Sequence, residues 1–229
     1  MNVSGRIDRA DRWEREDGAY LRVVDYKTGS REFTFGDLYH GLNAQLPLYL
    51  CELLREEPGA RPAGFFYLPA RNEFPAVDPD AGEEEIRREK AKLLRYKGLM
   101  LGDREVWEAM DPGYLGEEGR LPLTVVTGKD GGKSVRQDSN ITDLEGFEAI
   151  RKHMERTLRR MNDEIRKGRV DADPYTLGGG DACAWCRFRP VCRVYPGKDE
   201  GVRRLLSGMR CRDFMEQISG ETGEEAPHA

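Results

Sequence analysis

The sequence contains no apolar run long enough to cross a membrane, and its N-terminus does not resemble a secretory signal peptide. It is poor in histidine, and each of the three, His40, His153 and His228, is expected to be incidental rather than a ligand. No internal repeat or extended linker interrupts the 229 residues. These absences exclude membrane and repeat proteins, and a cytoplasmic protein without a membrane partner is expected by default.

The composition that remains is 38% apolar and 34% charged, which is typical of a charge-rich globular protein able to bury a core. A net charge of −5 argues mildly against a nucleic-acid partner, but the charge is unevenly distributed. Residues 151–169 hold eight Lys or Arg against three Asp or Glu. This stretch predicts a helix whose basic face either binds phosphates or is simply solvated.

Hydrophobic spacing and turn residues predict an α/β fold. The predicted elements are a strand over 2–14, a strand over 19–29, a helix within 35–59, a strand over 62–70, a charged helix after 80, a hairpin over 121–139 and a long helix over 142–168. Asp80 is the expected cap of the charged helix. Thr142 and Glu145 have the spacing of a capping box for the long helix, which Gly168 ends.

An acid and a base stand two residues apart where the apolar run Val-Val-Asp-Tyr-Lys, residues 23–27, ends. With Asp17-Gly18 as the hairpin turn, Asp8 faces Lys27, and Ala10 faces Asp25. Side chains alternate along a strand, so Asp8, Asp25 and Lys27 are expected on one face of the sheet. Taken alone, Asp25 and Lys27 are weak evidence for catalysis, because an ordinary ion pair at a strand end is the commoner explanation; Asp8 on the same face strengthens the catalytic interpretation.

Two carboxylates beside a lysine suit the chemistry of a hard cation. Mg²⁺ binds through one or two carboxylates, keeps several waters and accepts phosphate oxygens. The metal polarises a phosphodiester and acidifies a bound water, while an ammonium orients that water and offsets developing charge. The cluster therefore predicts phosphodiester hydrolysis.

Gln45 and Tyr49 are four residues apart, so they lie on one side of a helix if both are helical. Pro47 stands between them, and proline is tolerated in the first turn of a helix or at a kink. The helix is therefore expected to begin or bend near Asn43. In isolation, a polar residue at a helix start and an aromatic residue in the core explain the pair.

In order and spacing, "GRIDR", "VVDYKTG" and "QLPLY" resemble the motifs of the PD-(D/E)XK nucleases of the RecB-like group. Downstream, "PAGFFYLPARNE", "KGLMLGDREVWEAMDP" and "DADPYTLGGGDACAWCRFRPVCR" resemble the C-terminal nuclease domain of the B subunit of bacterial AddAB helicase–nucleases. The resemblance implies a restriction-endonuclease-like core, a mixed central sheet flanked by helices, with a C-terminal iron–sulfur lobe. The implied division is a nuclease core over 1–175, a cysteine lobe over 176–195 and a helical or flexible tail over 196–229.

The resemblance also assigns roles to residues. The implied catalytic residues are Asp8, Asp25, Lys27, Gln45 and Tyr49. The implied ligands of Mg²⁺ or Mn²⁺ are Asp8, Asp25 and the backbone carbonyl of Tyr26, while Gln45 and Tyr49 belong to an element that helps to position DNA. Such domains cut single-stranded DNA exonucleolytically while a helicase partner unwinds duplex ends for recombinational repair of double-strand breaks.

Two departures and two rival interpretations accompany this resemblance. Ile7 stands where the motif has proline, as often in the RecB-like group. The family's preceding helix, with a metal-binding histidine or acid, would lie before Met1, so the sequence is expected to be a fragment. The rivals are a catalytically silent domain that binds DNA or braces a helicase, and an iron–sulfur nuclease of CRISPR adaptation.

Three of the five cysteines, Cys183, Cys186 and Cys192, have the spacing C-x₂-C-x₅-C. In a reducing cytosol this spacing indicates a metal site more than disulfides, and it is equally compatible with zinc and with an iron–sulfur cluster. The resemblance implies a 4Fe–4S cluster that staples the C-terminal end to the N-terminal side, with its fourth cysteine upstream. Cys211 is a nearer substitute for that fourth ligand, and Cys51 is expected in the core.

The segment "GKDGGKS", residues 128–134, superficially resembles a phosphate-binding loop. Only three residues separate Gly128 from Gly132, where the motif needs four between its glycines. The segment also reads as the turn and return strand of a hairpin, whereas the motif leads from a strand into a helix. No nucleotide site is expected here.

Overall fold

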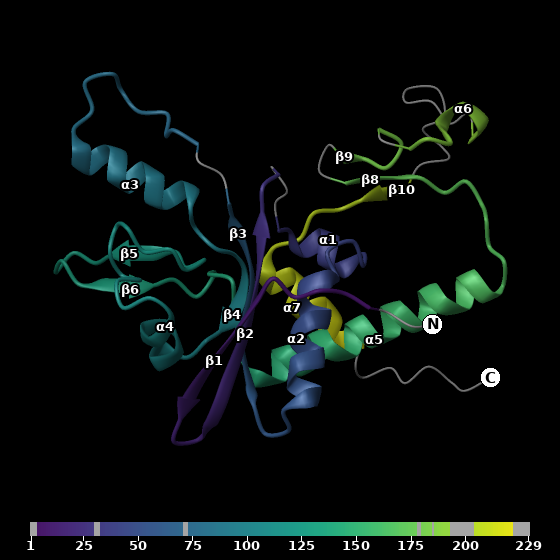
Figure 1. The fold of residues 1–229 in the computed structure, drawn as a ribbon, viewed down its shortest axis with the longest axis horizontal. Helices are drawn as coiled ribbons and strands as arrows, with labels where there is room; N and C mark the ends of the chain where they lie inside the picture. The colour runs from purple at the N-terminus through teal and green to yellow at the C-terminus, as the bar shows by residue number, and fades with distance from the viewer. Residues whose placement is uncertain are drawn as a thin grey trace.

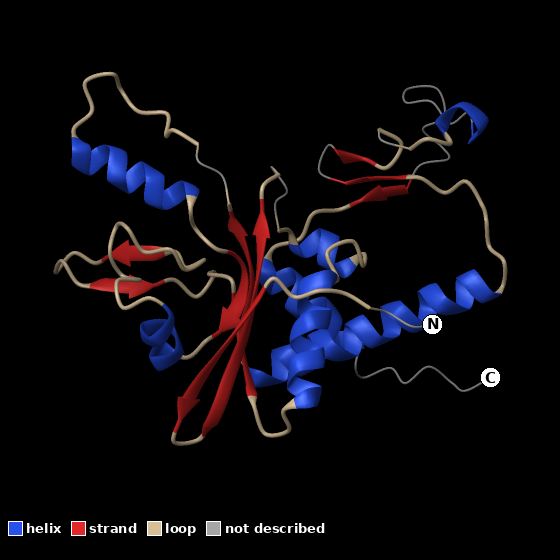
Figure 2. Cartoon of the chain, viewed as in Figure 1, coloured by secondary structure: helices blue, strands red, loops and turns tan. Residues whose placement is uncertain are grey.

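The computed structural model describes residues 4–29, 33–70, 73–177, 180–184, 186–192 and 204–221. At its centre is a twisted five-stranded sheet in the order β1-β2-β3-β4-β7 (Figures 1 and 2). Its strands are β1 (Arg9–Arg15), β2 (Gly18–Lys27), β3 (Arg61–Pro69), β4 (Lys97–Leu101) and β7 (Ile141–Thr142). Because β2–β3 and β4–β7 are parallel while β1–β2 and β3–β4 are antiparallel, the sheet is mixed, as predicted.

Two layers flank this sheet (Figure 1). One consists of the helices α1 (Phe35–Tyr39), α2 (Gln45–Glu56), α5 (Leu144–Arg166) and α7 (Cys211–Glu221). The other consists of α3 (Glu83–Leu93), α4 (Arg104–Met110) and the hairpin of β5 (Val125–Thr127) with β6 (Lys133–Val135). A small sheet stands apart from both, with β8 (Tyr175–Leu177), β9 (Gly180–Asp181), β10 (Arg204–Leu206) and the short helix α6 (Arg189–Cys192).

Alternation along the central strands divides the apolar side chains between two cores. Val23 and Phe65 pack in the core under α1, α2, α5 and α7, whereas their neighbours Val24 and Phe66 pack in the core on the opposite side. All four are fully buried. Asp25 comes two residues after Val23, so the same alternation turns it toward the helical layer that contains α2.

The hairpin of β1 and β2 has a different turn from the predicted one. Arg15 pairs with Gly18, so Glu16 and Asp17 form the turn instead of Asp17 and Gly18. Gly18 has φ of 128°, a conformation that glycine adopts at least cost. The Asp17 carboxylate accepts a hydrogen bond from the Tyr20 hydroxyl at 2.9 Å, which holds the turn in this position.

The new turn corrects the predicted cross-strand pairs. Ala10 pairs with Val23 rather than with Asp25. Asp8 precedes Arg9, whose partner is Val24, so Asp8 comes level with Asp25 rather than with Lys27. The register is shifted by two residues, and because the side-chain period of a strand is two, a shift of this size leaves every side chain on its predicted face.

Helix boundaries agree with the sequence except at two caps. α2 begins at Gln45 with Pro47 in its first turn, as predicted. Asp143, not Thr142, caps α5 by accepting a hydrogen bond from the Gly146 amide at 2.8 Å, because Thr142 belongs to β7. The charged helix α3 has Gly82 at its N-cap and no side-chain cap, so the prediction of Asp80 in that role is wrong.

The C-terminal helix belongs to the core. Phe214 and Ile218 of α7 are fully buried and pack among residues of α1 and α5. Within the predicted helical or flexible tail, residues 211–221 are helical, and an apolar stripe on this helix completes the helical layer. Residues 222–229 lie outside the described part of the chain, and the division into three domains stays a prediction.

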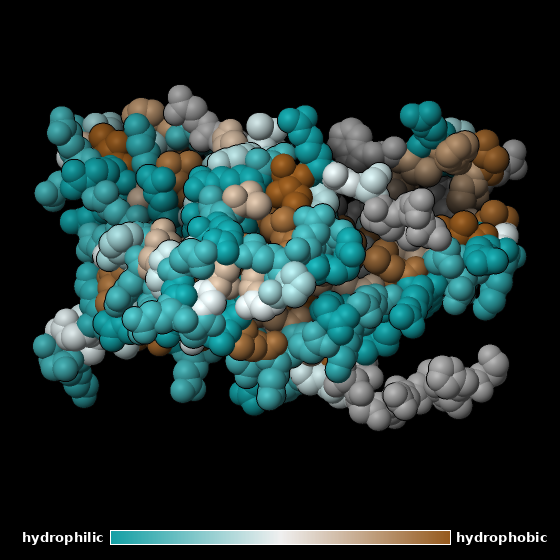
Figure 3. Space-filling model, turned by 60° about the horizontal axis from the view of Figure 1, so that its bottom comes forward, coloured by the Kyte–Doolittle hydropathy of each residue, from teal (hydrophilic) through white to brown (hydrophobic). Residues whose placement is uncertain are grey.

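Two predicted exclusions can be compared with the structure. Residues 128–132 join β5 to β6 as the turn of a hairpin, so the segment that superficially resembles a phosphate-binding loop leads into a strand, as predicted. Within the described residues no helix has the length and apolarity needed to span a membrane. Polar side chains cover most of the face seen in Figure 3, with small apolar areas between them.

Candidate active site

The end of β2 places a buried acid beside a lysine. The Asp25 residue is 4% exposed, and Lys27 Nζ lies 2.5 Å from its Oδ2 atom. That oxygen is buried and has no partner aligned for a hydrogen bond among the described residues, so its contact with Lys27 is an ion pair rather than a directed hydrogen bond. A buried carboxylate oxygen of this kind retains a lone pair for a cation.

The first turn of α2 holds the other oxygen of the same carboxylate. Gln45 Nε2 donates a hydrogen bond to Asp25 Oδ1 at 3.3 Å and another to the Tyr49 hydroxyl at 3.2 Å. The spacing of four residues puts Gln45 and Tyr49 on one side of the helix, as the sequence predicts. The pair therefore connects α2 directly to the acid on β2.

Tyr49 also holds the segment that leads to the second acid. Its hydroxyl accepts a hydrogen bond from the Arg6 amide at 3.0 Å. A Cβ on Gly5 would lie 2.3 Å from the same hydroxyl oxygen, so only glycine allows this approach. The contact fixes the path of the chain three residues before Asp8.

Asp8 itself is exposed and reaches β2 through its side chain. Its Oδ2 atom accepts a hydrogen bond at 3.1 Å from the amide of Tyr26, the residue between Asp25 and Lys27. The structure thus brings all the predicted catalytic residues to the same end of β2. Asp8 contacts the backbone there, whereas Lys27 and Gln45 contact the Asp25 carboxylate.

The donor atoms at this site are those of a hard cation. The Asp8 and Asp25 carboxylates and the Tyr26 carbonyl are oxygen donors from neighbouring positions, and Mg²⁺ characteristically uses one or two carboxylates and keeps several waters. No group of three Cys, His, Asp or Glu side chains that could hold a metal occurs in the described part of the chain. The set of two carboxylates fits Mg²⁺ or Mn²⁺, but it does not fit a metal that needs a full cage of protein ligands.

Sequence reasoning missed Tyr67. The Lys27 ammonium lies 4.8 Å from the centre of the Tyr67 ring, a cation–π contact, and Tyr67 is the partner of Asp25 in the parallel pairing of β2 with β3. Its only signal in the sequence is an aromatic residue near the end of a predicted strand. Nothing in the sequence says which strand lies beside β2.

The cysteine segment is arranged differently. Cys183 is buried, whereas Cys186 and Cys192 are exposed. The Cys186 amide donates a hydrogen bond to the Cys183 carbonyl at 3.3 Å, and Cys192 ends the short helix α6. Because no three-ligand group is found within the described residues, these three thiols do not form an assembled metal site.

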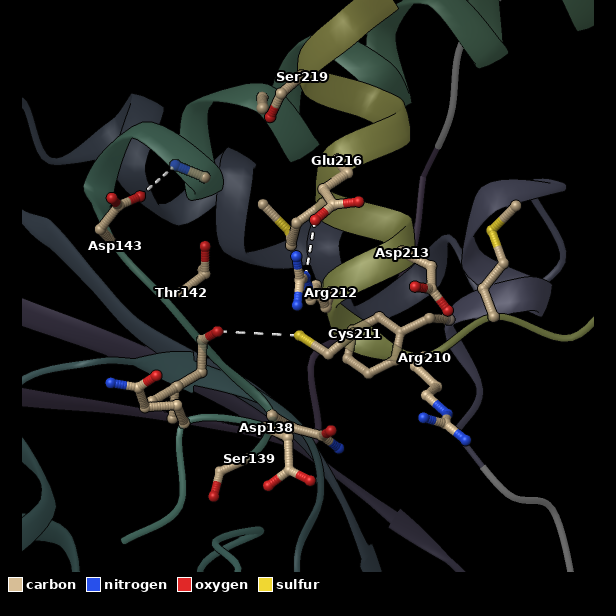
Figure 4. A pocket seen from close by; sticks show the side chains of 18 of the residues that line it. Asp138, Ser139, Thr142, Asp143, Arg210, Cys211, Arg212, Asp213, Glu216 and Ser219 are labelled. Carbon is tan, nitrogen blue, oxygen red and sulfur yellow. Dashed lines mark hydrogen bonds and ion pairs between the residues drawn. The ribbon is translucent and has the colours of Figure 1, made fainter.

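Neither remaining cysteine suits the role of a fourth ligand. Burial raises the pKa of Cys211 to about 11, and its Sγ donates to the Ile141 carbonyl at 3.8 Å (Figure 4). Burial likewise raises the pKa of Cys51 on α2 to about 11. Cys211 belongs to the core beneath the helical layer, and within the described residues neither Cys211 nor Cys51 forms a three-ligand group with the cysteine segment, so the substitution of Cys211 for an upstream ligand is not supported.

A large hollow of the described surface lies away from these residues. It measures about 2220 Å³ and is bounded by residues 136–143, the first turns of α5, and α7 (Figure 4). Neither Asp25 nor Lys27 lines it. Arg212 is paired with Glu216 at 2.7 Å, and Asp143 is occupied as a helix cap, so these two charged groups of the hollow serve local structure.

Comparison with known proteins gives a consistent result. Residues 1–193 match the family described as the PD-(D/E)XK nuclease superfamily. Two proteins named as the B subunit of an ATP-dependent helicase/deoxyribonuclease, from Bacillus thuringiensis (strain Al Hakam) and Bacillus cereus (strain G9842), are 34% and 33% identical to this chain. Each alignment covers 98% of this chain and 20% of the relative, so the chain spans about a fifth of the length of these relatives.

Proposed function

The chain belongs to the PD-(D/E)XK nuclease superfamily, and from that premise we propose that it is a deoxyribonuclease domain dependent on Mg²⁺ or Mn²⁺. Nucleases of this superfamily generally use divalent metals. The observation that carries the proposal is the buried Asp25 carboxylate, one oxygen of which is held by Gln45 while the other lies 2.5 Å from Lys27. Burying an ionised acid is costly unless it is paired and hydrogen-bonded, and at Asp25 the partners are Lys27 and Gln45.

Each residue of the site has a separate role in the proposed hydrolysis of the phosphodiester. Asp8, Asp25 and the Tyr26 carbonyl would hold the metal, which when bound would supply Lewis acidity toward a phosphate oxygen and make water more acidic. Lys27 orients the attacking water and offsets the charge that develops on the phosphate. Gln45 fixes Asp25 through Oδ1, and the Tyr67 ring limits where the Lys27 ammonium can lie.

The biological setting is part of the same proposal. The chain acts exonucleolytically on single-stranded DNA within an ATP-dependent helicase–nuclease, with a helicase partner, in double-strand-break processing and recombinational repair. The names of the relatives, which combine helicase and deoxyribonuclease, support this setting. The match over 98% of the chain favours it over an iron–sulfur nuclease of CRISPR adaptation.

We also propose that Cys183, Cys186 and Cys192 bind a 4Fe–4S cluster, with zinc as the alternative. The spacing supports a metal, and the exposure of Cys186 and Cys192 leaves them accessible to one. The proposed fourth ligand is a cysteine upstream of this sequence, since neither Cys51 nor Cys211 forms a ligand group with the segment within the described residues. An iron–sulfur cluster gives the anaerobically purified complete protein visible absorbance and bound iron, whereas zinc gives a colourless protein.

The nuclease proposal is tested by cleavage of single-stranded DNA with and without Mg²⁺. The complete protein is expected to cut only with the metal. The variants Asp25→Ala and Lys27→Ala are expected to lose this activity. The control Lys133→Ala, on the exposed hairpin strand β6, is expected to retain it. Absence of Mg²⁺-dependent cutting by the complete protein would overturn the proposal. It would favour the second candidate, a catalytically silent domain that binds DNA or braces a helicase, for which the exposed position of Asp8 is the supporting observation.

A further inference from the structure

The second half of α5 extends beyond the core. All the fully buried residues of this helix lie between Gly146 and Thr157, in its first four turns. From residue 158 to its end at Arg166 the helix has no buried side chain, and Figure 1 shows this part reaching past α2, away from the central sheet. Packing in the core therefore does not explain the side chains that this part carries.

Three of those side chains and that of the C-cap residue Lys167 form a basic face. Arg159, Arg160, Arg166 and Lys167 are exposed, and their separations of seven residues (159 to 166, 160 to 167) place them on one side of the helix. Asp163 lies among these four cations, and Glu164 lies beside them, with its pKa lowered by Arg169 and, to a smaller extent, by Lys167 and Arg160. The face is thus strongly positive on a protein whose net charge is −5.

These four cations differ from Arg151 and Arg169 in forming no close ion pair with the acids around them. Arg151 is paired with Glu148 and Glu155, and Arg169 with Glu164 and Asp171. None of the four on the basic face forms an ion pair within the described residues. Unpaired cations on one face repel one another, and a polyanion relieves that repulsion with release of its own counterions.

We propose that the face formed by Arg159, Arg160, Arg166 and Lys167 binds the phosphate backbone of DNA outside the catalytic residues. The inference rests on the proposed function, since it needs DNA as the substrate. The contacts are to phosphates and therefore independent of base sequence. Their role is to retain a long strand while its end is cut at β2.

The test compares two fourfold variants of the complete protein in binding to a labelled single-stranded oligonucleotide, with Ca²⁺ replacing Mg²⁺ and over a range of salt. One variant changes the four residues of the basic face to Gln. The control changes Arg55, Arg104, Arg212 and Lys92, exposed cations that are each paired on their own helices, to Gln. Both variants lose the same charge.

The basic-face variant is expected to bind at least about tenfold more weakly. In a plot of log affinity against log salt, the magnitude of its slope is expected to be smaller by about 2 to 3, because each lost phosphate contact on a single strand removes roughly 0.7 from the slope. The control is expected to keep the wild-type slope. Equal slopes in wild type and basic-face variant, equal losses in both variants, or a loss of binding to the helicase partner would overturn the proposal.

A short substrate separates this inference from the nuclease proposal. The p-nitrophenyl ester of thymidine 5′-phosphate carries one phosphate and cannot occupy the catalytic residues and α5 together. If wild type cleaves this ester, the basic-face variant is expected to cleave it at a rate within about twofold of the wild-type rate, whereas Lys27→Ala is expected not to cleave it. A large loss of rate in the basic-face variant would contradict a role outside the catalytic residues. If wild type cleaves neither this ester nor DNA, the nuclease proposal fails, and the binding comparison still decides the role of the face.

Discussion

The acid–base site on β2 and the cysteine segment after β9 both consist of metal-ligating residue types, yet they are assembled differently. At β2, Asp25 already contacts Lys27 and Gln45, and Asp8 already contacts the amide of Tyr26. In the cysteine segment, one thiol is buried, two are exposed, and they do not converge within the described residues. The first site is therefore built by protein contacts, whereas contacts among the described residues do not bring the three thiols of the second together.

The difference follows from where each set of residues lies. The β2 site is formed between a central strand and the first turn of a helix packed on it, so core packing fixes its geometry. The cysteines lie on turns and a four-residue helix beside a small sheet, with little apolar surface to position them. Protein packing specifies a site only where enough buried surface surrounds it.

The largest effect is expected from Lys27→Met. Cleavage should fall by about 10²- to 10⁴-fold, because a group that orients water and offsets charge in the transition state is lost. Stability should fall as well, by up to about 3 to 5 kcal/mol, since Asp25 remains buried without its counter-ion. Adding Asp25→Asn should restore most of the stability but no activity, as measured by urea unfolding and single-strand cleavage.

An unchanged stability in Lys27→Met would show that the ion pair between Lys27 and Asp25 is not preassembled. The β2 site would then resemble the cysteine segment more closely in how little protein contacts assemble it. Lys133→Met on the exposed strand β6 is the matched control and should alter neither quantity.

Gly5→Ala tests how closely the approach to Asp8 is constrained. The added Cβ would lie 2.3 Å from the Tyr49 hydroxyl, so the segment or the tyrosine must move. Cleavage is expected to fall by roughly 10- to 100-fold, the cost of misplacing reacting groups by about an ångström. Gly208→Ala, whose added Cβ meets no atom within 4 Å, should cut DNA at the wild-type rate.

At the cysteine segment the opposite pattern is expected. Cys186→Ser should remove most of the bound iron or zinc and lower the unfolding midpoint by several degrees, or about 1 kcal/mol or more, while cleavage at low temperature stays within about twofold. Elemental analysis, thermal unfolding and the cleavage assay measure the three quantities. Cys51→Ala should retain the metal; a loss of activity in Cys186→Ser without a loss of stability would mean that the segment takes part in the chemistry.

The smallest effect concerns an acid on β1. Burial opposes ionisation of Asp11, but hydrogen bonds from Arg9 and Arg22 outweigh it and lower its pKa below the ordinary value of 3.8. A lowered pKa in the folded state gives stability that is present above the unfolded pKa and is lost as pH falls through the folded pKa. Asp11→Asn should therefore cost about 1 kcal/mol or less at pH 7 and flatten the loss of stability below about pH 4. Urea unfolding at several pH values measures this, and an unaltered acid limb would contradict it.

Much of the fold could be predicted because its signals are local. The start of α2 at Gln45 follows from the limits that Pro47 imposes on a helix, and the β5–β6 hairpin follows from its glycines. The cap of α5 was misplaced by one residue because Thr142 and Asp143 are both good caps, and only the pairing of β7 with β4 assigns Thr142 to a strand. The sequence does not predict that α7 packs in the core, because its apolar stripe is buried only against α1 and α5, which are distant in the sequence.

The sequence by itself determined which side chains share a face at the end of β2, because a strand alternates with a period of two and an error of two residues in the register leaves the faces unchanged. Only the tertiary structure decided that Gln45 holds Asp25, that Tyr67 lies beside Lys27 and that Tyr49 holds the chain before Asp8. These contacts join segments about 20 to 45 residues apart. They depend on which strands are neighbours and on where a helix packs, and the free energy that settles both comes from the buried core as a whole.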